Sequence, residues 1–172
     1  MGDADSISTF QDYNRPAMDV ISGIPENEKV ILVGHSIGGA SLTHAIYRFG
    51  KKKISLVVYV AAAPANFFPD YIPALRPDIY LYHYGNGEDL APTSLIFGPD
   101  KQREMLHAHS PHEDSTLASM VMRWAPVMAL ADAPLKKEIE RATTLYVKTN
   151  KHKMITQELH ELLIHSSLQR RS

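Results

Sequence analysis

Residues 29–40 read Lys29-Val30-Ile31-Leu32-Val33-Gly34-His35-Ser36-Ile37-Gly38-Gly39-Ala40, an apolar run followed by a serine between glycines. The run predicts a strand at residues 30–34 that is buried on both faces. Apolar residues then recur at helical spacing as far as Gly50, which is expected to end the helix. A serine on a sharp turn between a strand and a helix holds its hydroxyl clear of the sheet, as nucleophilic catalysis requires.

Within this turn, Ser36 is the candidate nucleophile. The backbone N–H of Ile37 is the candidate oxyanion donor, because it lies at the N-terminus of the predicted helix. Gly34 and Gly38 are expected where a side chain would collide with the neighbouring strand and helix, and Gly39 continues the close packing. The alternative is a glycine-rich turn with an inert serine, which the flanking strand and helix disfavour.

Two further apolar stretches predict more strands of the same sheet. Residues 54–61 form the second strand, and strand, helix and strand together make one βαβ unit with a right-handed crossover. Residues 143–148 form the third strand, and a last helix begins near Thr156.

The chain is expected to form a single domain over residues 1–172. Its core comprises residues 5–63 and 135–168. Residues 64–134 are rich in proline and contain short helical patches but no strong strand. They are interpreted as a mostly helical cap inserted over the end of the sheet.

Composition excludes several classes of protein. The net charge is −1, which gives no basic surface for nucleic acid. There is no cysteine, so neither a disulfide framework nor a zinc–thiolate site can form, and no cofactor is expected. No apolar run is long enough to cross a membrane, and the acidic N-terminus lacks the features of a signal peptide. The sequence therefore predicts a cytoplasmic protein with neither a nucleic-acid nor a membrane partner.

Several segments resemble the plant methylesterase and hydroxynitrile lyase family of the α/β-hydrolase fold, and the similarity runs from about Asp5 to Leu163. The resemblance implies a partial α/β-hydrolase fold, with a parallel sheet, flanking helices and a cap. It also implies hydrolysis of small carboxylic methyl esters of the jasmonate, salicylate or indole acetate type, and His35 before the serine favours the esterase branch. The segments that carry it are Val30–Ala40, Asp12–Pro16, Pro25–Lys29, Val60–Pro64 and Ser110–Asp114.

The chain departs from the family pattern at the other catalytic groups. The family acid follows the third strand, where this chain has Lys151 or His152 instead of a carboxylate. The family histidine would lie beyond Ser172 and the second oxyanion donor before Asp5, so the chain is expected to be trimmed at both ends and impaired as an enzyme. The alternatives are an inactive relative or a small-ligand binder, and a hydroxynitrile lyase.

The remaining candidate residues are weaker. Four of them are candidate substrate contacts: Ala61, His83, Met122 and Trp124. His35 is expected to point away from Ser36, and His44, His160 and His165 are interpreted as surface residues. The cluster His107, His109 and His112 permits a zinc site, but a loop without metal is the favoured interpretation.

The first strand is also expected to lie at an edge of the sheet. An apolar edge strand is a hazard for association, and the sequence therefore predicts self-association of the isolated chain.

Overall fold

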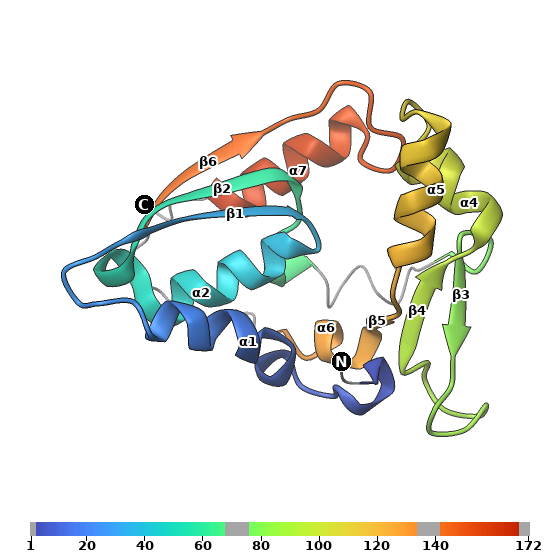
Figure 1. The fold of residues 1–172 in the computed structure, drawn as a ribbon, viewed down its shortest axis with the longest axis horizontal. Coiled ribbons are helices and arrows are strands. Elements are labelled where there is room, and N and C mark those ends of the chain that lie inside the picture. Colours follow the sequence, from blue (N-terminus) through green and yellow to red (C-terminus); the bar gives the residue numbers. More distant parts are fainter. Residues whose placement is uncertain (1–2, 68–75, 134–141, 169–172) are drawn as a thin grey trace.

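The computed structural model of the chain describes residues 3–67, 76–133 and 142–168. Its core is a parallel sheet in the order β1-β2-β6, and Figure 1 shows helices packed along it. The expected α/β architecture is confirmed. The core elements are α1 (Phe10–Ser22), β1 (Val30–Ser36), α2 (Gly38–Lys53), β2 (Ile54–Ala62), β6 (Thr143–Val147) and α7 (Gln157–Leu168).

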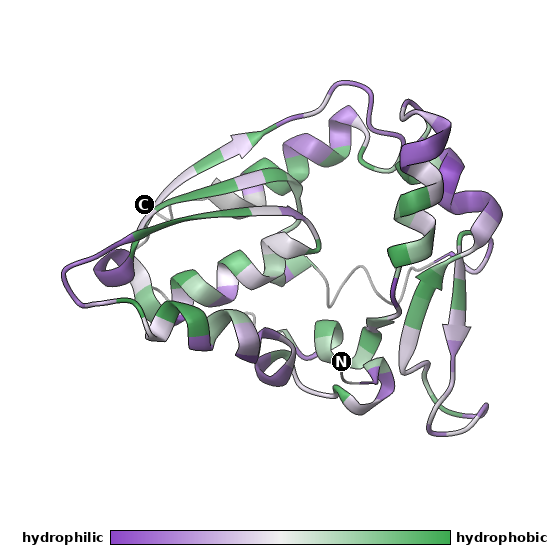
Figure 2. Cartoon of the chain, in the orientation of Figure 1, coloured by the Kyte–Doolittle hydropathy of each residue, from purple (hydrophilic) through white to green (hydrophobic). Residues whose placement is uncertain are grey.

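The predicted strands coincide with β1, β2 and β6, with ends that differ by one or two residues. β1 pairs with β2 from Val30 opposite Ile54 to Ser36 opposite Ala62, and β2 pairs with β6 in parallel. Figure 2 shows that β1 and β2 are hydrophobic over most of their length, whereas the connection from α1 to β1 is hydrophilic.

One expectation about β1 is wrong, because only one of its faces is covered. Val30 and Leu32 pack against the cluster formed by α1, α2 and β2. The alternate side chains, Ile31 and Val33, are 61% and 65% exposed. Successive side chains of a strand point to opposite faces, and the described helices pack against the Leu32 face.

Two apolar clusters hold the core together. In the first, α1 and α2 bury apolar side chains against Val57 and Tyr59 of β2. In the second, Phe10 of α1, Ala40 of α2 and Leu163 of α7 meet beneath the end of the sheet. Gly50 has φ 53° inside α2, so the helix is interrupted where its end was predicted.

The cap contains strands as well as helices, which corrects the expectation that it has no strong strand. β3, β4 and β5 form an antiparallel sheet of three very short strands. Strands of two to four residues are too short to give a period-2 pattern in the sequence. The cap elements are η2 (Ala65–Phe67), β3 (Tyr80–His83), β4 (Ser94–Phe97), α4 (Pro99–Leu106), α5 (His112–Val121), β5 (Ala125–Pro126) and α6 (Val127–Ala131).

The cap elements lie beyond the carboxyl ends of the parallel strands, as Figure 1 shows. The predicted boundary between cap and core, at residues 134 and 135, lies outside the described residues. Within the described ranges, no helix is long and apolar enough to cross a membrane.

Candidate active site

Ser36 occupies the sharp turn that the sequence predicts. It is the last residue of β1 and has φ 52°, a conformation that non-glycine residues rarely adopt. Ala63 N–H donates to the carbonyl oxygen of Ser36 across 3.1 Å, which ties the end of β1 to the segment that follows β2. The side chain of Ser36 is exposed at the carboxyl end of the sheet. Such strain persists only where the surrounding structure holds it.

The glycines around Ser36 serve different purposes. A Cβ at Gly34 would lie 2.7 Å from Leu42 Cδ1, and one at Gly39 would lie 2.3 Å from the carbonyl oxygen of Ala63. The expected close packing at these two positions is confirmed. The expectation for Gly38 is wrong, because a Cβ there would have no atom within 4 Å. Gly38 begins α2 and faces open space.

The backbone N–H of Ile37 lies at the start of α2, where Ile37 is the N-cap residue. The first N–H groups of a helix have no partner within the helix, and the helix dipole favours negative charge there. The position is therefore suited to an oxyanion that forms on a carbonyl attacked by Ser36.

Ser36 lies beside a cavity of about 210 Å³ between the core and the cap. Its walls are largely apolar: Tyr80, Leu95, Phe97 and Val127 from the cap, and Leu163 from α7. We call this cavity the apolar pocket. It fits a small molecule with an apolar body, because such sites are typically lined by apolar and aromatic side chains with a few polar groups.

The apolar pocket also has three nitrogen-bearing side chains in its wall. His35, Arg123 and His152 line it, and no described residue that lines it carries a carboxylate. Both His35 and Ser36 lie in its wall. Lys151, the other residue considered for the position of the family acid, is not part of that wall. Of the two residues considered for the position of the family acid, His152 and not Lys151 therefore lines the apolar pocket.

The environment of His152 determines where its ring proton lies. Its Nδ1 accepts the backbone N–H groups of Met154 at 3.1 Å and Ile155 at 3.0 Å. A ring nitrogen that accepts hydrogen bonds carries no proton, so the neutral imidazole is protonated on Nε2. Burial lowers the pKa of His152, and the neighbouring His35 and His160 lower it further. His152 is therefore a neutral hydrogen-bond donor through Nε2.

Of the four candidate substrate contacts, Met122 lines the apolar pocket, whereas Ala61, His83 and Trp124 do not. Ala61 is fully buried and has φ 41° near the end of β2. Trp124 is 41% exposed, and its ring centroid lies 6.0 Å from that of His83.

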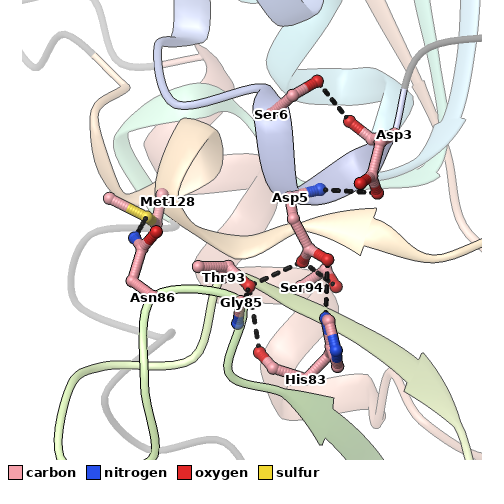
Figure 3. A network of polar contacts seen from close by, with 9 residues as sticks. All are labelled: Asp3, Asp5, Ser6, His83, Gly85, Asn86, Thr93, Ser94 and Met128. Atoms are coloured by element: carbon pink, nitrogen blue, oxygen red, sulfur yellow. Dashed lines mark hydrogen bonds and ion pairs between the residues drawn. The ribbon is translucent and has the colours of Figure 1, made fainter.

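His83 belongs to a polar network that joins the N-terminal segment to the cap (Figure 3). Its Nδ1 lies 2.6 Å from Oδ2 of Asp5. The other oxygen of the same carboxylate accepts the hydroxyls of Thr93 at 2.6 Å and Ser94 at 2.7 Å. These hydrogen bonds, first that of Thr93 and then that of Ser94, lower the pKa of Asp5.

Two histidines expected at the surface are at least partly buried. His160 is fully buried, with Nδ1 3.2 Å from the hydroxyl of Tyr146, because α7 turns this position toward β6. His44 is half-buried, and its ring packs edge-on against Phe10 at 5.3 Å. Burial lowers the pKa of both. His165 is exposed, as predicted.

The loop with His107, His109 and His112 does not gather them into a metal site. Within the part of the chain that the structure describes, no three histidine or carboxylate side chains are placed to hold a metal ion.

The parallel sheet, the strained serine at its carboxyl end and the cap over it together define the α/β-hydrolase class. Comparison with known proteins narrows this class. The chain is 38% identical over 175 residues to methylesterase 17 of Arabidopsis thaliana, covering 93% of this chain and 63% of that protein. It is 35% identical to methylesterase 18 of the same plant, covering 94% of this chain and 68% of that protein.

A crystal structure of the methylesterase MES16 from Arabidopsis superposes with a TM-score of 0.80 at 35% identity, covering 95% of this chain and 66% of that one. No protein-family model matches the chain. The chain belongs to the plant methylesterase family. It spans 60–65% of the length of the first curated relatives that it matches.

Proposed function

We propose that the chain is a carboxylic ester hydrolase that acts through Ser36 on methyl esters of small apolar acids, of the jasmonate, salicylate or indole acetate type. The observation that carries the proposal is the strained conformation of Ser36 at the mouth of the apolar pocket. Strain at such a position is typical of a residue whose geometry serves a reaction.

In the proposed reaction, Oγ of Ser36 attacks the ester carbonyl carbon, and the C–O bond to the methoxy group then breaks. The negative charge of the tetrahedral intermediate lies on the former carbonyl oxygen, beside the N–H of Ile37. Methanol leaves with the proton of the serine hydroxyl, and water releases the acid from the acyl-enzyme. The reaction needs a base for the serine proton.

A second candidate function is the binding of a small acid or ester without turnover. It is favoured by the loop after β6, where the family resemblance places the acid at Lys151 or His152 and this chain has no carboxylate at either position. A triad carboxylate accepts the Nδ1–H of the catalytic histidine and so fixes its tautomer. In the tautomer set by the two N–H groups on Nδ1, Nε2 of His152 is a donor and not an acceptor, so it cannot accept the Nδ1–H of a catalytic histidine.

Fluorophosphonate labelling separates the two functions. The esterase predicts rapid stoichiometric modification of Ser36 that is lost in Ser36→Ala and kept in Ser41→Ala, a matched change in the following helix. Binding without turnover predicts no modification of wild type, together with saturable binding of indole-3-acetate or its methyl ester. Absence of both modification and binding would contradict both candidates.

A further inference from the structure

A second cavity adjoins the apolar pocket. It has a volume of about 480 Å³ and lies between α4, the segment after α4 and the loop that follows β6. We call it the basic cavity. The two cavities share two lining residues, Leu106 and His152, so they lie next to each other.

The charges of the basic cavity have one sign. Its charged side chains are those of Lys151 and Lys153, and no described residue of its lining carries a carboxylate. Its other residues include polar groups such as Asn150 and Ser110. Glu104 pairs with Lys101 at 2.8 Å, and the hydrogen bond and charge of Lys101 lower the pKa of the glutamate, with a smaller contribution from Lys153. An anion in this cavity would meet positive charge and neutral donors.

His152, one of the two residues that line both cavities, is also a hydrogen-bond donor. The two backbone N–H groups on Nδ1 hold His152 as the Nε2–H tautomer. A carboxylate in place of His152 would repel an anion in the basic cavity, whereas the neutral imidazole donates to one. A histidine instead of a carboxylate at this position is thus unfavourable for orienting a catalytic histidine, but it is favourable for holding an acidic ligand.

We propose that the basic cavity is a subsite for a second, anionic group of the ligand, so that the site selects an apolar ester that also carries a free carboxylate. The apolar body lies beside Ser36, His152 stands between the two parts, and Lys151 and Lys153 face the anionic end. The proposal rests on the proposed ligand site at Ser36 and specifies the class of molecule that occupies it.

A matched pair of ligands tests this subsite. Monomethyl azelate and dimethyl azelate share the apolar chain and one methyl ester, and they differ in the second carboxylate. Isothermal titration calorimetry with the whole chain at neutral pH is expected to give about tenfold tighter binding of the monomethyl ester. The difference should shrink at about 1 M salt, because exposed charges are then screened.

Variants test which residues cause the preference for the monomethyl ester. In the double variant Lys151→Gln with Lys153→Gln, we expect the preference for the monomethyl ester to fall about tenfold while binding of the dimethyl ester is unchanged. The control is Lys29→Gln with Lys52→Gln, which removes the same charge elsewhere and should change neither affinity. His152→Asp should also abolish the preference, whereas Asn150→Asp, an equal charge at an exposed residue that lines only the basic cavity, should only reduce it.

Equal affinity for the two esters would overturn the proposal, as would a preference that survives the double lysine variant, or binding of neither ester. These results are independent of fluorophosphonate labelling. If Ser36 is labelled and the two esters bind with equal affinity, the esterase proposal stands and the anionic subsite is ruled out. If Ser36 is not labelled and the monomethyl ester binds more tightly, the anionic subsite stands and the esterase proposal is ruled out.

Discussion

The α-carbon of Gly39 lies so close to Ala63 that a methyl group on it would be 2.3 Å from the carbonyl oxygen of Ala63. This approach packs the first turn of α2 against the segment after β2. Gly39→Ala must therefore displace backbone and is expected to lower the free energy of unfolding by about 3 kcal/mol or more. Urea unfolding measures the change. Gly38→Ala is the matched control and should change stability by less than about 1 kcal/mol, since that position is open. Equal effects at the two positions would contradict the described packing.

The strain at Ser36 can be measured by relieving it. Glycine adopts a positive φ without steric cost, whereas alanine keeps the Cβ. We expect the free energy of unfolding of Ser36→Gly to be about 1 kcal/mol greater than that of Ser36→Ala, although both variants lack the hydroxyl. Thermal and urea unfolding of the two variants provide the comparison. If the alanine variant is as stable as the glycine variant, φ at this position is not strained.

The carboxylate of Asp5 is expected to stabilise the contact between the N-terminal segment and the cap. Asp5→Ala leaves the buried hydroxyls of Thr93 and Ser94 without this acceptor, and we expect a loss of about 2 kcal/mol. Asp89→Ala, on an exposed loop, is the control and should have little effect.

The contribution of Asp5 should also depend on pH. Its pKa is lowered in the folded chain from the ordinary value of 3.8, so its stabilisation is complete above about that pH and is lost as the pH falls through the folded value. Unfolding free energies of wild type and Asp5→Ala should therefore converge in strong acid. A constant difference at all pH values would argue against an ionised Asp5.

The buried histidines predict a second pH dependence at milder acidity. Burial lowers the pKa of His44, His152 and His160 below the ordinary value of 6.5, so the unfolded chain takes up protons before the folded one. Stability is then complete above about pH 6.5 and declines as the pH falls through the folded values. In urea unfolding between about pH 7.5 and pH 5.5, His160→Gln should weaken this decline. An unchanged decline in His160→Gln would mean that His160 is not responsible.

The uncovered face of the sheet predicts self-association. Val33, Val58 and Leu145 lie in register across β1, β2 and β6, and the side chains of Val33 and Leu145 are 65% and 51% exposed. Parallel sheets in folded proteins are normally covered on both faces. We expect Val33→Lys to shift sedimentation toward monomer, and Val20→Lys, equally exposed but on α1, to leave it unchanged. A wild-type chain that is monodisperse and monomeric would contradict the prediction.

The sequence by itself determined the elements around Ser36 and the family. The apolar run before Gly34 and the helical spacing after Gly39 are local patterns, and they place a strand, a turn and a helix without reference to the rest of the chain. A long apolar run likewise predicts β2, and a short stretch rich in β-branched and aromatic residues predicts β6.

The packing partners, the burial of side chains and the pairing of short strands depend on contacts between distant segments, and only the tertiary structure decided them. The partner of Gly39 is Ala63, which no local pattern connects with it. The burial of His160 depends on how α7 packs against β6, and the pairing of β3 with β4 depends on strands too short to show a period. The choice between Lys151 and His152 follows from which side chain of one loop lines the apolar pocket. Adjacent loop residues face different surroundings, and only the packed chain shows which of them lines the apolar pocket.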